Sequence, residues 1–170
     1  MDSRLKSLVT LSVLGVLLVI GGAWGLSALT QPFPGQADPP VCVDVPFTKG
    51  DRITRSDVTV SVLNAGTRNG LAGLTMDLFV DAGFTQGQEG NSDAGPRVDT
   101  VEIWTDEPRH PAVRLVAQQL GNAVDVVRRD PTTAGVQVVV GDAFEDLVKG
   151  PRGIAVRKDV EVCGAPSDLG

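Results

Sequence analysis

Hydrophobic and polar residues follow two successive patterns over Val58–Phe84, which together predict a strand, a turn and a helix. Apolar residues occupy every second position of Val58–Val62, which is typical of a strand with one buried face. Asn64–Gly70 is rich in residues that tolerate turn conformations with positive φ. Leucines at helical spacing over Leu71–Ala82 predict an amphipathic helix, and Gly83 predicts its end.

A second strand–helix pattern follows a polar segment. We expect a short strand that starts at Phe84, followed by a loop over Gln86–Arg97, which contains glycines and a proline. β-Branched residues in Val98–Trp104 predict a strand, and the apolar spacing of Val113–Leu120 predicts a second helix. Two starts fit this helix, because Asp106–Pro108 offers cap and first-turn residues while Pro111 suits a first helical position.

Two further apolar runs complete the pattern. Val124–Val127 and Val136–Val140 are predicted to be short strands, the second of them after the turn Asp130–Thr133. Two strand–helix–strand units in series predict an α/β fold of the α+β sandwich type, in which a mixed sheet carries two helices on one face.

The N-terminal part carries a different pattern, an uncharged apolar run over Leu8–Leu29. About 20 apolar residues suffice for a helix that spans a membrane. Arg4 and Lys6 precede the run and no basic residue follows before Lys49, so the positive-inside rule predicts a cytoplasmic N-terminus and an extracytoplasmic domain. A cleaved signal peptide is the alternative, for which Gly35–Ala37 supplies small residues far from the apolar run.

Proline and glycine mark a boundary after this run. Residues 31–40, QPFPGQADPP, cannot form a helix or a central strand, and they predict a stiff spacer. The predicted organisation is a cytoplasmic tail (1–7), a transmembrane anchor (8–29), a proline-rich linker (30–40) and an exported domain (41–170) with a core at about 58–147.

Charge and composition exclude some partners. The 170 residues include 15 Lys and Arg against 21 Asp and Glu, which gives a net charge of −6. Nucleic acid repels an acidic domain, so we expect no nucleic-acid binding. Aromatic residues make up only 4 % of the chain and tyrosine is absent, which disfavours an aromatic platform for stacking sugars.

The only two cysteines, Cys42 and Cys163, lie near opposite ends of the predicted exported domain. Each lies in a short alternating apolar run, so we expect two adjacent strands joined by a disulfide, which is typical of a lone pair outside the cytoplasm. Closing so long a loop would stabilise the fold by roughly 3–5 kcal/mol in the chain-entropy model. Two free buried thiols are the alternative.

Several short motifs, taken in order, resemble a LytR C-terminal-type domain. They are VSVLNAGTRNGLAGL at Val60–Leu74, the helix end at Ala82–Phe84, the second helix end at Leu120–Gly121, and VVVGDAF at Val138–Phe144. Ala65–Thr67 stands where the family often has Gly-Thr, and Gly141–Phe144 departs slightly from the closing motif of the family. The resemblance covers roughly Val58–Leu147.

This resemblance implies an exported, non-catalytic module that acts in maintenance of the cell wall or envelope. In larger relatives the domain follows a LytR-CpsA-Psr phosphotransferase domain that joins polymers to peptidoglycan, and we expect that catalytic domain to be absent from this chain. The partners implied are a cell-wall polymer or LytR-CpsA-Psr-type wall enzymes, and the predicted anchor adds the cytoplasmic membrane.

Residues of catalytic type do not form a recognisable site in the sequence. His110 is the only histidine, a metal site needs several ligands, and no Gly-x-Ser-x-Gly motif is present. We expect His110 to lie at the surface where a helix starts, and Asp142, Glu145 and Asp146 to form a solvated helix start rather than an ion site. Arg128–Arg129 would point to opposite faces of a strand. We therefore predict no catalytic residue, metal or cofactor.

The turn of Asn64–Gly70 is the strongest candidate for a binding site. It places backbone N–H groups at a helix N-terminus, where anions bind, and Arg68 adds positive charge. The candidate binding residues are Asn64, Gly66, Thr67, Arg68, Asn69 and Gly70. The alternative is a purely structural turn in which Asn64 bonds to its own backbone.

The expected function is that of a membrane-anchored, extracytoplasmic module without enzymatic activity, which binds or scaffolds wall components or wall-assembly enzymes. A peptidoglycan- or glycan-binding module is the first alternative, and retention on purified peptidoglycan would distinguish it. A small exported enzyme is the second alternative, which the missing catalytic constellation disfavours.

Overall fold

The computed structural model describes residues 10–22, 42–92 and 97–164. Met1–Pro39 and Pro40–Gly170 form two separate compact units. Residues 10–22 of the first unit are helical, and their side chains are exposed. Among the described residues, none of the helices has the length and apolar character needed to cross a membrane. The predicted linker and the rest of the predicted anchor, residues 8–9 and 23–29, lie outside the described residues.

Five strands form the central sheet of the second unit. They are β3 (Thr59–Asn64), β4 (Thr85–Asn91), β5 (Val101–Thr105), β6 (Val124–Arg128) and β7 (Val136–Val140), and their order across the sheet is β4-β3-β7-β5-β6. β3 is parallel to β4 and β7, and β5 is parallel to β6 but antiparallel to β7. The sheet is therefore mixed, as the sequence predicts.

Two helices cover one face of this sheet. α2 (Leu71–Asp81) connects β3 to β4, and α3 (Pro111–Leu120) connects β5 to β6. Crossovers between parallel strands are right-handed, and β5 runs opposite to β3, so both helices lie on the same face. Their apolar sides share one hydrophobic core with alternate strand residues. The largest buried members include Val60, Val62, Met76, Phe79, Ile103, Leu115, Val116 and Val138.

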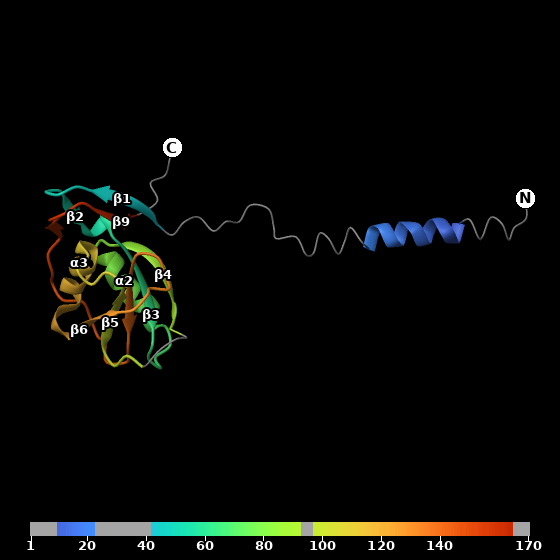
Figure 1. Cartoon of the computed structure of the whole chain (residues 1–170). Helices are drawn as coiled ribbons and strands as arrows, with labels where there is room; N and C mark the ends of the chain where they lie inside the picture. The colour runs from blue at the N-terminus through green and yellow to red at the C-terminus, as the bar shows by residue number, and fades with distance from the viewer. Residues whose placement is uncertain (1–9, 23–41, 93–96, 165–170) are drawn as a thin grey trace, which may run out of the picture. The chain divides into compact units, whose positions relative to one another are not determined.

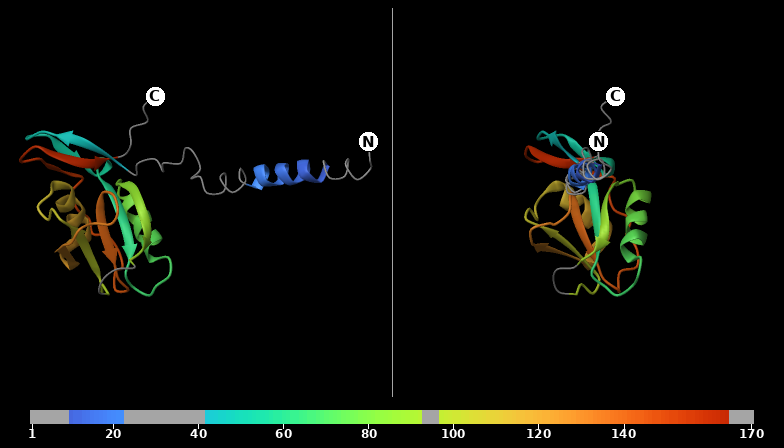
Figure 2. Two further views of the ribbon diagram at one scale, coloured as in Figure 1. Left: turned by 45° about the vertical axis from the view of Figure 1, so that its right-hand side comes forward. Right: turned by 90° about the vertical axis from the view of Figure 1, so that its right-hand side faces the viewer.

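Two small antiparallel ribbons flank this α/β core. β1 (Val43–Phe47) pairs with β9 (Val160–Gly164), and β2 (Arg52–Thr54) pairs with β8 (Gly153–Ala155). The β1–β9 ribbon lies across one end of the core (Figures 1 and 2). Val162 of β9 is buried within the hydrophobic core, so this ribbon is a packed part of the domain.

A disulfide joins Cys42 to Cys163, as the sequence predicts, and the two Cα atoms lie 5.3 Å apart. Cys163 belongs to β9 and Cys42 directly precedes β1, so the bond closes the β1–β9 ribbon. The two cysteines are 121 positions apart in the sequence. Nearly all of the described domain therefore lies between them.

The face of the sheet away from the helices is covered by loops. Gln137 of β7 is fully buried there, and its Oε1 atom accepts hydrogen bonds of 2.7–3.2 Å from the N–H and hydroxyl groups of Thr132 and Thr133. Gly135 lies so close to the backbone of Thr59 that a Cβ atom would collide with it. These contacts fix the loop of residues 131–135 against the start of β3.

β4 begins where the sequence predicts a short strand, but it extends to Asn91 through residues that the sequence wrongly predicts to be a loop. Gln86–Arg97 lacks apolar alternation, yet Thr85–Asn91 pairs in parallel with β3 at the edge of the sheet. Most side chains of an edge strand such as this remain exposed, so backbone pairing rather than burial decides its conformation.

Two further predictions are corrected by the structure. Residues 142–150 form no helix, because Asp142 turns back towards the end of β3 instead of starting a new element. β5 begins at Val101 rather than at Val98, whose side chain packs with Leu63 and Val139 on the loop-covered face of the sheet.

Candidate functional site

The turn between β3 and α2 is held together by hydrogen bonds from Asn64, which is 8 % exposed. Asn64 Oδ1 accepts a hydrogen bond from the N–H of Gly66 at 2.9 Å, and Asn64 Nδ2 donates to the carbonyl oxygen of Arg68 at 2.8 Å. Gly70 adopts a positive φ of 76° and caps the N-terminus of α2. The turn therefore contains the local Asn64 bonds that a structural role requires.

Asp142 occupies backbone donors of the same turn. Its Oδ1 atom accepts hydrogen bonds from the N–H groups of Thr67 at 2.8 Å and Arg68 at 3.0 Å, and its Oδ2 atom accepts from the Thr67 hydroxyl at 2.8 Å. The Arg68 side chain donates to the carbonyl oxygens of Asp142 and Phe144, both at 3.3 Å. The hydrogen bond from the Arg68 backbone and those from Thr67 hold the pKa of Asp142 below its ordinary value.

The turn thus binds a carboxylate that belongs to the chain itself. Gly66 makes this possible, because a Cβ atom there would collide with the Asp142 side chain. An external anion would have to displace Asp142 from Thr67 and Arg68. Asn69 is exposed beside this carboxylate clamp. Binding of an external anion at the turn stays a prediction.

His110 is the N-cap of α3 and links that helix to β9. Its Nδ1 atom accepts a hydrogen bond from the N–H of Ala112 at 3.3 Å, which assigns the ring proton to Nε2. Nε2 then donates to the carbonyl oxygen of Glu161 at 3.0 Å. Pro111 takes the first helical position, which decides between the two predicted starts of the helix.

The remaining candidates of the sequence do not form a site together. Arg129 stacks its guanidinium 4.1 Å from the centre of the Trp104 ring, whereas Arg128 is exposed at the end of β6. In the described part of the chain, no three or more His, Cys, Asp or Glu side chains are grouped so that they could hold a metal ion.

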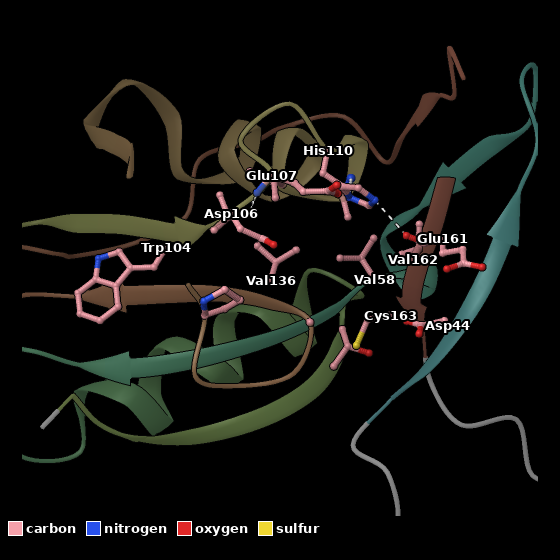
Figure 3. A pocket seen from close by; sticks show the side chains of 16 residues that line it. Asp44, Val58, Trp104, Asp106, Glu107, His110, Val136, Glu161, Val162 and Cys163 are labelled. Carbon is pink, nitrogen blue, oxygen red and sulfur yellow. Dashed lines mark hydrogen bonds between the residues drawn. The ribbon is translucent and has the colours of Figure 1, made fainter. Parts of the chain in front are cut away.

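A cavity of about 280 Å³ opens between the β1–β9 ribbon, the end of β5 and the start of α3. The loop of residues 131–135 and the segment that enters β3 complete its walls. Figure 3 shows Val58 and Val136 in the middle of this space, with Asp106 towards β5 and Glu161 on β9. His110 spans the upper side through its hydrogen bond to Glu161 (Figure 3).

This cavity has an apolar inner wall and an acidic rim. The buried apolar residues that line it include Val58, Val113, Val136 and Val162. The exposed carboxylates that line it are those of Asp44, Asp106, Glu107 and Glu161. The carboxyl end of a strand that leads into a helix is a common place for ligands in α/β sheets, and the end of β5 occupies that position here.

Sequence reasoning missed this cavity because its walls come from segments far apart in the chain. Asp44 precedes Asp106 by a whole strand–helix–strand unit, and Glu161 follows both units. The signal in the sequence was the acidic pair Asp106-Glu107 between an apolar strand and a helix, although these residues also fit one of the two predicted starts of that helix. The actual cap is His110, so both carboxylates are left for the cavity rim.

A family model described as "LytR cell envelope-related transcriptional attenuator" (LytR_C) matches residues 57–144. This range contains both strand–helix–strand units and β7, and it ends just after Asp142. A crystal structure of the soluble domain of a conserved hypothetical secreted protein from Mycobacterium marinum is similar, with 23 % identity over 59 % of this chain and 77 % of that chain, and a TM-score of 0.43. No curated protein matches the chain.

Proposed function

The chain belongs to the LytR_C family of cell envelope-related proteins, and from this premise we propose that it is a non-catalytic, extracytoplasmic module of the cell envelope. In this proposal the domain binds or positions cell-wall components or wall-assembly enzymes at the outer face of the membrane. The observation that carries it is the family match over residues 57–144, which spans the α/β core and the Asp142 clamp.

The disulfide supports an extracytoplasmic position. Disulfides persist in oxidising compartments and are rare where glutathione and thioredoxin keep thiols reduced. The bond between Cys42 and Cys163 encloses nearly all of the described domain, which favours such a compartment.

A single-pass anchor over Leu8–Leu29, with the N-terminus in the cytoplasm, completes the proposal. Its support is the uncharged apolar run, of which residues 10–22 are helical with exposed apolar side chains. Large apolar side chains that face solvent along a helix need a lipid or protein environment.

The absence of catalysis in this proposal is supported by the state of His110. Both of its ring nitrogens are engaged, one with the backbone of α3 and the other with the backbone of β9. A general base needs a ring nitrogen free to take a proton from a substrate, and this histidine is instead used for capping.

Crosslinking in intact cells tests the proposed function. A photo-reactive residue is placed singly at exposed positions, such as Asp77 on α2, Asp125 on β6 and Glu107 near α3. The expected products are conjugates with wall polymer or with membrane proteins of wall assembly. Capture of cytosolic proteins alone would contradict the proposal. Retention of the domain on purified peptidoglycan identifies the polymer itself as the partner.

A further inference from the structure

The two edges of the central sheet differ in how far they are protected against pairing with another strand. β4 forms one edge and β6 forms the other (Figure 1). β4 contains Gly87 and Gly90 and shifts its register against β3, and irregularities of this kind protect an edge. β6 has the sequence VDVVR and pairs with β5 in unbroken register. It contains no glycine, proline or lysine, so β6 is the unprotected edge.

The outer backbone groups of β6 are free to pair. The N–H of Arg129 donates to the carbonyl oxygen of Thr105 in β5 at 3.0 Å. Backbone groups point to alternate sides along a strand, so those of residues 124, 126 and 128 point away from β5. In the described part of the chain, no backbone group outside the sheet bonds to β6. The side chains of Val126 and Arg128 are exposed, which agrees with an uncovered edge.

The charges on this edge are unbalanced within one chain. Asp125 lies opposite Glu102 of β5, and like charges directly opposite one another in a sheet are unfavourable. The next cation on the same face of the strand, Arg129, stacks its guanidinium 4.1 Å from the centre of the Trp104 ring. An arginine supplied by a second strand beside β6 would relieve the repulsion between the two carboxylates.

We propose that β6 is a dimerisation edge, at which two copies of this chain pair in antiparallel fashion and join their sheets. A twofold axis perpendicular to the sheet keeps each face continuous, so odd-numbered residues of β6 pair with odd-numbered ones. With this axis at Val127, Asp125 of each copy lies directly opposite Arg129 of the other. The same register places Val126, which is 38 % exposed, opposite Arg128 of the other copy, whose aliphatic stem covers it.

The charges of the edge favour a second copy over an unrelated strand. A twofold contact uses the same patch on both partners, so the patch must complement itself. Asp125 and Arg129 meet this condition, since each finds the opposite charge in the other copy. The chain carries a net charge of −6, which opposes association elsewhere, so local complementarity selects this edge and its register. A single strand pair buries little surface, and the expected dimer is therefore weak.

Sedimentation velocity of the full chain in a non-ionic detergent tests the proposal, at about 10 µM to about 500 µM because so small an interface associates weakly. We expect the wild type to convert from monomer to dimer over this range, and Val126→Pro to stay monomeric. This variant removes an N–H that points away from β5, and edge strands tolerate proline at such positions. Circular dichroism should therefore show an intact fold.

Charge variants test the register. Asp125→Arg and Arg129→Asp should each weaken self-association by at least about ten-fold, because each places like charges opposite one another. An equimolar mixture of the two should recover the association as a heterodimer, since every contact between positions 125 and 129 then joins opposite charges. Asp77→Arg, the same change of charge on the exposed side of α2, is the matched control and should associate like the wild type.

A wild-type chain that stays monomeric at every concentration, or a dimer that Val126→Pro leaves intact, would overturn the proposal. Folded charge variants that fail to associate when mixed would overturn it as well. The Val126→Pro result does not involve the stacking of Arg129 on Trp104, so it decides the question even where Arg129→Asp loses stability. None of these outcomes bears on the envelope role, which crosslinking in cells tests through the other partners of the domain.

Discussion

The Asp142 carboxylate occupies the hydrogen-bond donors of a turn whose geometry is typical of an anion-binding site. Backbone N–H groups at the start of a helix favour negative charge. Here Asp142, which follows the end of β7, places its own negative charge against the N–H groups of Thr67 and Arg68. The result is a structural tie between two strand ends.

Replacing Asp142 by Asn should lower stability at neutral pH, since the charge that faces the turn donors is lost. The folded-state pKa of Asp142 is depressed, so its contribution is present above the ordinary aspartate pKa and disappears as the pH falls through the depressed value. Urea unfolding of the wild type and Asp142→Asn at pH 7 and at about pH 3 should show a difference that shrinks in acid.

Glu145→Gln is the control for this experiment, because Glu145 is an exposed carboxylate nearby with no part in the clamp. Its effect on stability should be small at both pH values. A difference between wild type and Asp142→Asn that is constant with pH would contradict the account of the clamp.

Two glycine substitutions should have opposite effects on stability. A Cβ at Gly66 would collide with Asp142, so Gly66→Ala should lower the free energy of unfolding by about 1–3 kcal/mol. A Cβ at Gly73, within α2, would meet only Glu89 Oε2 at 3.6 Å, so Gly73→Ala should raise it by about 0.5–1 kcal/mol. Thermal unfolding followed by circular dichroism measures both variants. Changes of the same sign in the free energy of unfolding would contradict the contacts assigned to Gly66 and Gly73.

At the scale of elements, burial decides what the sequence can predict. β3 and β7 carry apolar residues that face the helices, and their pattern shows in the sequence. β4 has no such pattern, because it is an exposed edge strand whose conformation follows from pairing with β3. α3 was predicted from its apolar spacing, but its N-cap is a histidine that prediction rules for caps do not favour.

The β3–α2 turn and the cavity also differ in how far the sequence predicts them. The residues of the β3–α2 turn are continuous in the sequence, so the sequence identifies them. The hydrogen bonds that Asp142 accepts from this turn join residues 74 or 75 positions apart, and no local pattern indicates them. The cavity lies between elements that meet only in the folded chain. Its acidic rim could not be assembled from sequence spacing, since Asp44 and Glu161 come together through the β1–β9 pairing.

Arg55, in the short 3₁₀ helix η1 (Arg55–Asp57), joins elements that are remote in sequence. Its guanidinium donates to the carbonyl oxygens of Ala82, Gly150 and Pro151 at 2.8–3.1 Å. It also lies 6.0 Å from the centre of the Phe84 ring.

Arg55→Lys should therefore lower the free energy of unfolding by about 1–3 kcal/mol, because an ammonium group cannot reproduce the planar set of donors. Arg157→Lys, at an exposed position, should change it by less than about 0.5 kcal/mol. Urea unfolding at pH 7 measures both variants, and equal effects would contradict the role of Arg55 as a link.

At the scale of the whole molecule, the disulfide closes a chain segment of 121 positions around the α/β core. Replacing Cys42 and Cys163 together by Ala should lower the free energy of unfolding by roughly 3–5 kcal/mol, since the open unfolded chain gains conformational freedom. Equilibrium unfolding in urea measures the loss, and an unchanged midpoint would show that the ribbon needs no crosslink.

The central claim is that a disulfide-closed domain of the LytR_C family works outside the cytoplasm, and the state of the two cysteines in living cells tests it most directly. Cells are quenched in acid, free thiols are alkylated under denaturing conditions, and the intact mass of the native protein is measured with and without prior reduction. We predict no alkylation without reductant and two alkyl groups on the chain after reduction. Two alkyl groups without reductant would place the domain in a reducing compartment and contradict the envelope role.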